Sequence, residues 1–203
     1  FNDIVARAFE NELAGYEGIT SRRFDDPTGQ RDIPLQERTD NANQWNAQYY
    51  ISFHHNAVVG TWGNHTGVET FVYIGNKNTE SGKLAVAIHP AVVKAYGLKD
   101  RGIKEANLHI VRETKMPAIL IEGGFMDSII DIRKLRDKNV LENVGRMIAQ
   151  ALATYLKLKN PSTPVEEEEV SSVFLNETGR TEIRSLLKKA RSEGIIDAEV
   201  HTD

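Results

Sequence analysis

The chain has 203 residues, 40% of them hydrophobic and 27% charged, a composition typical of a globular protein with one sizeable core and a small appendage. Its formal net charge of -4 supplies no basic face for a phosphate backbone, so we expect no nucleic-acid partner. The absence of cysteine excludes disulfides, thiolate zinc sites and a cysteine nucleophile, and leaves His, Asp and Glu as metal ligands. No apolar run approaches the roughly 20 residues that cross a bilayer, so we expect no membrane insertion.

The first part of the chain predicts two helices and a strand. Apolar residues recur at helical spacing over residues 3–13, which indicates an amphipathic helix. A polar stretch over residues 20–38 is typical of a long loop, and it leads into a second helix near residues 35–47. Residues 49–53 are dense in aromatic and β-branched side chains and predict the first strand.

The middle of the chain continues this alternation. Residues 68–74 predict a strand with both faces partly covered. Ser81 is expected to cap a helix that is kinked at Pro90 and ends at Gly97. Another strand is expected over residues 107–111.

Two further elements complete the sheet protein. Residues 118–121 are wholly apolar and are followed by a glutamate and two glycines, the pattern of a central strand buried on both faces. An apolar stripe over residues 141–155 predicts a long helix. Strands that alternate with helices indicate an α/β fold.

The composition changes after this helix. Prolines and a run of glutamates over residues 159–172 predict an extended acidic linker. Beyond it, residues 181–190 predict one amphipathic helix, which could not bury its own apolar face alone. We therefore expect a domain over residues 1–158 and the start of a second module over residues 173–203.

The first group of candidate site residues follows the predicted strand at residues 49–53. Ser52, His54, His55 and Asn56 lie at its carboxyl end, the edge where open α/β sheets bind ligands. Alternation puts His54 and His55 on opposite faces, so only one of them points into a given site. A neutral imidazole is a good zinc ligand that a neighbouring hydroxyl or amide can orient, although a structural or surface role is the alternative.

Glu122 is the second candidate. It follows a buried apolar strand and precedes two glycines, so its carboxylate lies where a substrate can approach the backbone closely. The alternative roles are the capping of a following helix and pairing with an arginine such as Arg101 or Arg112. Together, a histidine ligand and a carboxylate base at one sheet edge are the parts of metal-assisted hydrolysis. The chain lacks a Gly-x-Ser-x-Gly elbow, which disfavours serine hydrolase chemistry.

Several motifs occur in a fixed order along the chain. They are Leu35-x-x-Arg38-x-x-x-Ala42-Asn43, Ser52-x-His54-x-Asn56, Gly67-x-Glu69, Arg101-Gly102 and Met-Pro-Ala-Ile-Leu-Ile-Glu-Gly-Gly-Phe at residues 116–125. In this order they resemble the motifs of the zinc N-acetylmuramoyl-L-alanine amidases of the amidase-3 family. The resemblance covers most of residues 1–158.

The resemblance implies a twisted, mixed and largely parallel sheet flanked by helices, with one catalytic Zn²⁺. It implies cleavage of the amide between N-acetylmuramic acid and the L-alanine of the peptidoglycan stem peptide. His54 would be a zinc ligand, Glu122 the catalytic base, and Asn56 a neighbour of the metal. Ser52, Glu69 and His65 are further candidates for contacts with the substrate or with the ligands.

The family's two other zinc ligands, a histidine and a glutamate, would lie upstream of Phe1, so we expect the protein to extend further in that direction. Residues 170–194 are similar to the start of small wall-binding modules of phage and Bacillus-type lysins, which favours a lytic enzyme of a phage or prophage. We expect a monomer that acts on bacterial peptidoglycan outside the cytoplasm, after phage-encoded release or after secretion.

Two alternatives remain beside this amidase. One is a zinc peptidase or carboxypeptidase on the same fold, since a fold and a His/Glu pair do not determine the scissile bond. The other is a non-catalytic wall-binding protein. Outside the candidate site we expect ordinary structural roles for three histidines, with His89 in a helix, His109 on a strand face and His201 near the end of the chain.

Overall fold

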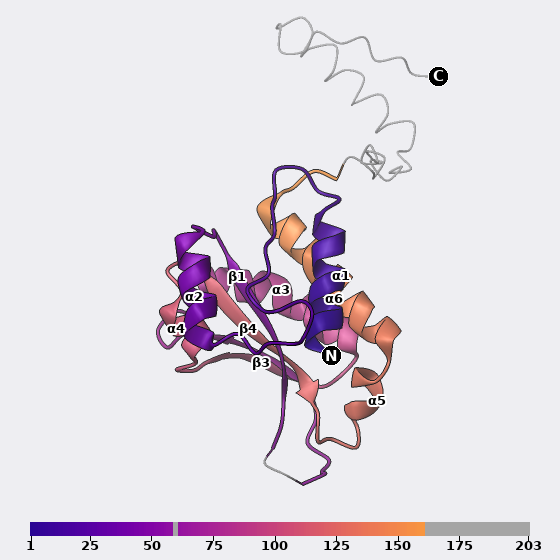
Figure 1. Ribbon diagram of the computed structural model, residues 1–203. Coiled ribbons are helices and arrows are strands. Elements are labelled where there is room, and N and C mark those ends of the chain that lie inside the picture. Colours follow the sequence, from indigo (N-terminus) through magenta and orange to yellow (C-terminus); the bar gives the residue numbers. More distant parts are fainter. Residues whose placement is uncertain (59–60, 161–203) are drawn as a thin grey trace, which may run out of the picture. The chain divides into compact units, whose positions relative to one another are not determined.

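A computed structural model describes residues 1–58 and 61–160, which contain both helices and strands (Figure 1). In chain order the elements are α1 (Asn2–Leu13), α2 (Leu35–Gln44), β1 (Tyr50–Asn56), β2 (Val68–Val72), α3 (Glu80–Tyr96), β3 (Asp100–Glu105), α4 (His109–Glu113), β4 (Ala118–Phe125), α5 (Ile132–Leu135) and α6 (Lys138–Leu156). The predicted α/β fold is confirmed. From residue 161 onward, the predicted linker and C-terminal module lie outside the described residues, so these boundaries stay predictions.

The strands form one mixed sheet in the order β1-β4-β2-β3. The β1/β4 and β2/β3 pairs are parallel, and β2 runs antiparallel to β4. The expected mixed, largely parallel sheet is therefore confirmed. As predicted, the apolar strand β4 is central. Glu122, which follows the apolar run of β4, therefore lies between β1 and β2.

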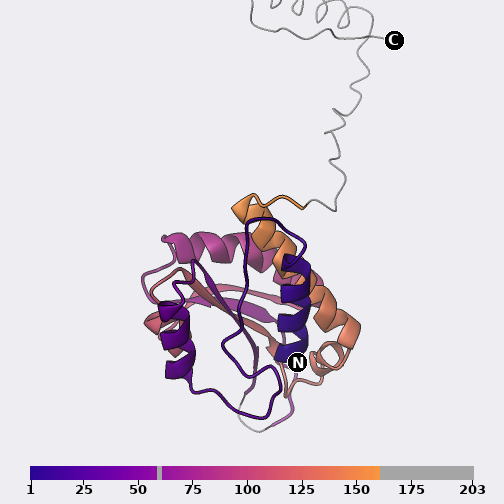
Figure 2. The same ribbon diagram turned by 45° about the horizontal axis from the view of Figure 1, so that its top comes forward.

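Helices cover both faces of the sheet (Figures 1 and 2). Ile119 and Ile121 of β4 belong to the main core, which α1, α3 and α6 complete on one face. Ala118 and Leu120, which alternate with them, belong to a smaller core that includes Val111 of α4. The strand is apolar on both sides because each side packs against a different helical layer.

Local sequence signals determine where the long helices begin and end. Gly97 follows α3 in a left-handed conformation with φ of 59°, as predicted for a glycine after a helix. α3 is continuous across Pro90. Asp137 caps α6, because its carboxylate accepts hydrogen bonds from the backbone amides of Asn139 and Val140.

Two local predictions are wrong. Residues 107–111 contain no strand: the strand is Asp100–Glu105, and α4 begins at His109. Ser81 does not cap α3, which begins at Glu80 after Thr79. Instead, the Ser81 hydroxyl accepts a hydrogen bond from the amide of Ala118 at 3.1 Å and ties α3 to the start of β4.

A groove of ≈ 790 Å³ runs along β1 at the edge of the sheet. Its walls come from α1, from residues 18–31 and from residues 45–54, and Leu152 and Leu156 of α6 contribute to it. Ser52 and His54 line it, so the carboxyl half of β1 faces a ligand-sized hollow. Among the described residues, no helix has the length and apolar character needed to cross a membrane.

Candidate functional site

Three side chains form a row across three strands. Glu122 of β4 is the parallel partner of His54 on β1 and the antiparallel partner of Glu69 on β2. Side chains at paired positions lie on the same face of a sheet. The row lies on the face of α2 and α4, since Glu122 shares it with Ala118 and Leu120. The sheet thus brings together three residues that are far apart in the sequence.

Irregularities in the pairing flank this row on both sides. Between His54 and Asn56 the β1/β4 register shifts, so that two residues of β4, Gly123 and Gly124, oppose the single residue His55 of β1. Gly124, with φ of 108°, supplies the backbone conformation for this bulge. A second shift in the β2/β3 register, next to Glu69, places Arg101 beside that carboxylate. Such bulges re-aim side chains, and here they do so at the candidate site.

Glu122 is the least satisfied polar group of the row. Its Oε2 is buried and has no hydrogen-bond partner among the described residues. Burial, together with the negative charge of Glu69, raises the pKa of Glu122 to about 7. A carboxylate with such a pKa can accept and return a proton near neutral pH. The alternative that Glu122 pairs with an arginine is wrong: Arg101 bonds to Glu69, and Arg112 bonds to Glu113.

Glu69, in contrast, is fully engaged. Its Oε1 accepts a hydrogen bond from the Asn56 amide at 2.9 Å, and its Oε2 accepts from Arg101 Nε at 2.8 Å and from Lys104 Nζ. Burial alone would raise the pKa of Glu69, but the hydrogen bonds from Lys104 and Arg101 outweigh it and hold the pKa below its ordinary value. Glu69 therefore stays ionised and fixes the position of Asn56.

His54 is a neutral imidazole at the other end of the row. Burial, and to a lesser degree the positive charge of Arg38, lower its pKa below the ordinary 6.5. The Ser52 hydroxyl lies 2.8 Å from Nε2, and in the described residues Nδ1 has no hydrogen-bond partner. Neutral, oriented by a hydroxyl and with one nitrogen available, His54 has the properties of a metal ligand.

His55 points the other way, as strand alternation predicts. Its Nε2 lies 2.9 Å from the Tyr96 hydroxyl and its Nδ1 lies 2.5 Å from Asn2 Oδ1. Tyr96 in turn occupies the space beside Gly123, where a Cβ atom would lie 2.2 Å from its hydroxyl oxygen. His55 and Tyr96 thus support the backbone next to Glu122 from the opposite face.

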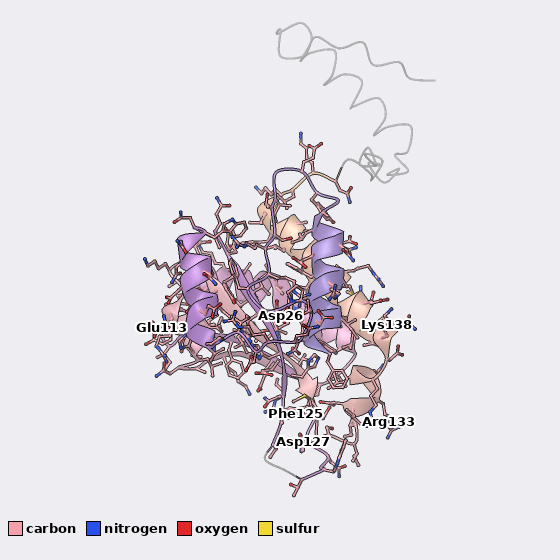
Figure 3. All side chains as sticks on the ribbon, in the orientation of Figure 1. Asp26, Glu113, Phe125, Asp127, Arg133 and Lys138 are labelled. Atoms are coloured by element: carbon pink, nitrogen blue, oxygen red, sulfur yellow. The ribbon has the colours of Figure 1, made fainter. Side chains whose placement is uncertain are left out.

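Beyond the row, the chain turns in a loop that includes His65. Phe125 ends β4 and Asp127 follows it (Figure 3). His65 Nε2 bonds to Asp127 Oδ1 at 2.7 Å, and its ring packs edge-on against Phe125. Buried Asp131 accepts hydrogen bonds from the backbone amides of Gly67 and Phe125, both at 3.0 Å. His65 therefore supports this loop, and its proposed contact with the substrate stays a prediction.

The remaining histidines have structural roles where they are described. His89 bonds to Thr70 and Asp100, both at 2.9 Å, and so ties α3 to β2 and β3. His109 begins α4 and lies 3.3 Å from the Thr39 hydroxyl, so its predicted place on a strand face is wrong. His201 lies outside the described residues.

Lys104, the second cation on Glu69, is not among the residues predicted from the sequence. The signal was available in Asp-Arg-Gly-Ile-Lys-Glu at residues 100–105, where a strand-length segment carries two cations. The segment is poor in apolar residues, so the sequence pattern does not predict a strand there.

The described residues contain no group of three or more His, Asp or Glu side chains arranged to hold a metal ion. His54 supplies one suitable nitrogen, and the unpartnered Oε2 of Glu122 is a polar atom that lacks a counterpart. A catalytic zinc takes three protein ligands. The described residues therefore fit part of such a site and do not complete it.

A carboxylate with a raised pKa beside a neutral histidine with an available nitrogen, on neighbouring strands of a mixed α/β sheet, is the kind of arrangement that metal-assisted hydrolases use. The Amidase_3 family, described as N-acetylmuramoyl-L-alanine amidase, matches residues 1–154. The chain belongs to this family.

Individual proteins agree with this assignment. The chain is 34% identical over 155 residues to a sporulation-specific N-acetylmuramoyl-L-alanine amidase of Bacillus subtilis (strain 168), covering 75% of this chain and 56% of that protein. It is 34% identical over 145 residues to an endolysin of Bacillus phage SPP1, covering 68% of this chain and 52% of the endolysin. The chain thus spans little more than half the length of these relatives.

A solved structure is also similar. The catalytic domain of CwlV, an N-acetylmuramoyl-L-alanine amidase from Bacillus (Paenibacillus) polymyxa var. colistinus, matches with a TM-score of 0.69 and 27% sequence identity. The match covers 77% of this chain and 83% of that domain. The sheet and its flanking helices are therefore those of an amidase catalytic domain.

Proposed function

We propose that this chain is the catalytic part of a zinc-dependent amidase that cleaves the bond between N-acetylmuramic acid and the L-alanine of the stem peptide. The observation that carries the proposal is the pairing of His54 with Glu122 on adjacent parallel strands, with a buried Glu122 oxygen left unpartnered. The family match and the similarity to the phage endolysin support a lytic role on the bacterial cell wall.

Glu122 acts as the base in this proposal. With a pKa of about 7, it is ionised often enough near neutral pH to take a proton from the attacking water. The water oxygen then forms a bond to the lactyl carbonyl carbon, and the protonated Glu122 returns the proton to the departing L-alanine nitrogen. Glu69 keeps its charge throughout, because Lys104 and Arg101 hold its pKa low.

His54 would hold the zinc in this proposal, with Ser52 fixing the orientation of its ring. A bound Zn²⁺ would supply a Lewis acid that polarises the carbonyl and acidifies water. Because the described residues supply too few ligands, the remaining ligands have to come from outside them. We further propose that the protein acts outside the cytoplasm as a monomer, with peptidoglycan as its partner.

Digestion of purified peptidoglycan tests the proposal. The natural full-length protein with zinc should release stem peptides that carry a new free L-alanine amino group, detected by end-group labelling. Glu122→Gln should keep the bound zinc and lower kcat by about 10²–10⁴, the usual contribution of a general base. Glu113→Gln is a matched control, since Glu113 lies in the exposed pair with Arg112 and should leave the rate unchanged.

Other outcomes identify the alternatives. New C-termini within the stem peptide, without a free L-alanine amine, would assign the chain to the zinc peptidases or carboxypeptidases. A protein that holds no zinc, releases no ends and still sediments with cell walls would be a wall-binding protein. Retained turnover in the Glu122 variant would contradict the role of this residue as the base.

A further inference from the structure

The carboxylate of Glu69 is bonded to more positive charge than it neutralises. Its Oε2 receives both Arg101 and Lys104, so the cluster of these three side chains carries one surplus positive charge. A single cation would suffice to compensate one buried carboxylate. The cluster can therefore compensate the charge of one further anionic group.

The two cations are also open to a further partner. The Glu69 side chain is only 4% exposed, whereas Arg101 is 32% and Lys104 39% exposed. Among the described residues, Arg101 donates only from Nε, so both terminal nitrogens of its guanidinium have no acceptor there. The guanidinium lies 5.0 Å from the centre of the Phe125 ring, which holds it in place. A fixed guanidinium with free donors is suited to a carboxylate.

The position of this cluster relative to Glu122 indicates which carboxylate of the substrate the two cations could bind. Glu69 and Glu122 are paired residues on adjacent strands, and such strands lie about 4.8 Å apart. One residue of extended chain spans about 3.3–3.6 Å. A group one residue beyond the scissile bond at Glu122 would therefore reach the cations. In a stem peptide, the residue after L-alanine is D-glutamate, or its α-amide D-isoglutamine.

We infer that Arg101 and Lys104 form a subsite for the α-carboxylate of the second stem residue, so that the enzyme prefers D-glutamate over D-isoglutamine at this position. The inference rests on the proposed amidase function. It assigns direction to the row of site residues: the muramic acid side lies toward His54 on β1, and the peptide extends over β2 toward β3.

Two muramoyl tripeptides test the subsite. They differ only in the second residue, which carries either an α-carboxylate or an α-carboxamide, and both are cleaved by the natural full-length protein with zinc. We expect kcat/KM to be higher for the carboxylate by about tenfold or more, the size of a hydrogen bond to a charged group. High salt should reduce this preference, since the charges are partly exposed.

Lys104→Met should reduce the preference to within about twofold. The variant loses an ion pair with the carboxylate substrate, whereas the uncharged carboxamide substrate makes no such ion pair in either protein. The ratio of the two substrates is the readout, since a merely structural defect lowers both rates equally. Lys99→Met is the matched control: it removes one positive charge from exposed Lys99 just before β3, away from Glu69, and should keep the preference. Arg101→Lys serves as a second variant should Lys104→Met not fold, and it should weaken the preference while keeping the charge.

Equal kcat/KM values in the wild-type protein, or a preference that survives in Lys104→Met, would overturn the subsite. Failure of the proposed function gives a different result, namely no cleavage of either tripeptide. Calorimetric binding of the two tripeptides to the wild-type protein still decides the subsite in that event, since a carboxylate preference in affinity requires no turnover.

Discussion

Glu122 should destabilise the folded protein when it is ionised and no metal is bound. Its pKa is about 7 in the fold, against an ordinary value of 4.5. A tenfold difference in proton affinity is worth about 1.4 kcal/mol, so the ionised carboxylate disfavours folding by ~3 kcal/mol above pH 7. Because the folded pKa is the higher one, protonation favours the fold, and this stability is lost as the pH rises from 4.5 through 7.

Glu122→Gln removes this charge and keeps the shape of the side chain. We expect the variant to be more stable than the wild type by ~3 kcal/mol at about pH 8.5 and by only ~1 kcal/mol at about pH 5. Urea unfolding of both proteins in the presence of a chelator measures the difference. Equal stabilities at the higher pH would refute the reasoning, since they would mean that the buried oxygen costs nothing when charged.

Two further substitutions probe the support of the site. Gly123→Ala should destabilise the protein by about 1–3 kcal/mol, because the new Cβ would lie 2.2 Å from the Tyr96 hydroxyl, and Tyr96→Phe in the same chain should recover part of the loss in thermal unfolding. Asp131→Ala should cost about 3 kcal/mol or more in urea unfolding, because it leaves the buried amides of Gly67 and Phe125 without acceptors.

Each of these has its own check. Full additivity of Gly123→Ala and Tyr96→Phe would contradict the steric explanation, since contacting residues should couple. For Asp131 the matched control is Asp32→Ala, whose side chain is 98% exposed in a surface ion pair with Arg38 and which should change stability by no more than about 1 kcal/mol. If both aspartate variants lost a similar free energy of unfolding, the buried hydrogen bonds of Asp131 would stabilise the fold no more than a surface ion pair does.

The sequence predicted the elements whose side chains face a core. The strand at residues 118–121 and the helix at residues 141–155 are recognisable because burial demands apolar residues at set spacings. Glu122 and His54 could be placed at one sheet edge for the same reason, since each follows a strand of this kind. That they are register partners required the structure.

The sequence predictions are wrong for elements that bury few apolar side chains. β3 is an edge strand with charged residues, so Asp100–Glu105 carries no apolar alternation, whereas residues 107–111 alternate by chance and begin a helix. The role of Glu69 was equally hidden, because its partners Arg101 and Lys104 come from that unrecognised strand. The sequence therefore named His54, Glu122 and Glu69 as candidates, whereas the ion pairs of Glu69 required the structure.

The position of Glu122 within strand β4 limits how this site can change. Strand side chains alternate between faces, so inserting or deleting one residue in β4 ahead of Glu122 would exchange Glu122 with its neighbour. After a deletion the acid would take the place of Ile121 on the main-core face and Gly123 would stand opposite His54, and after an insertion Ile121 would stand there. A substitution in β4 changes one side chain and leaves the others in place, whereas a change in the length of that strand moves Glu122 off the face that carries His54. Homologous amidases should therefore vary in length in their loops, and keep the spacing from residue 118 to Glu122 fixed.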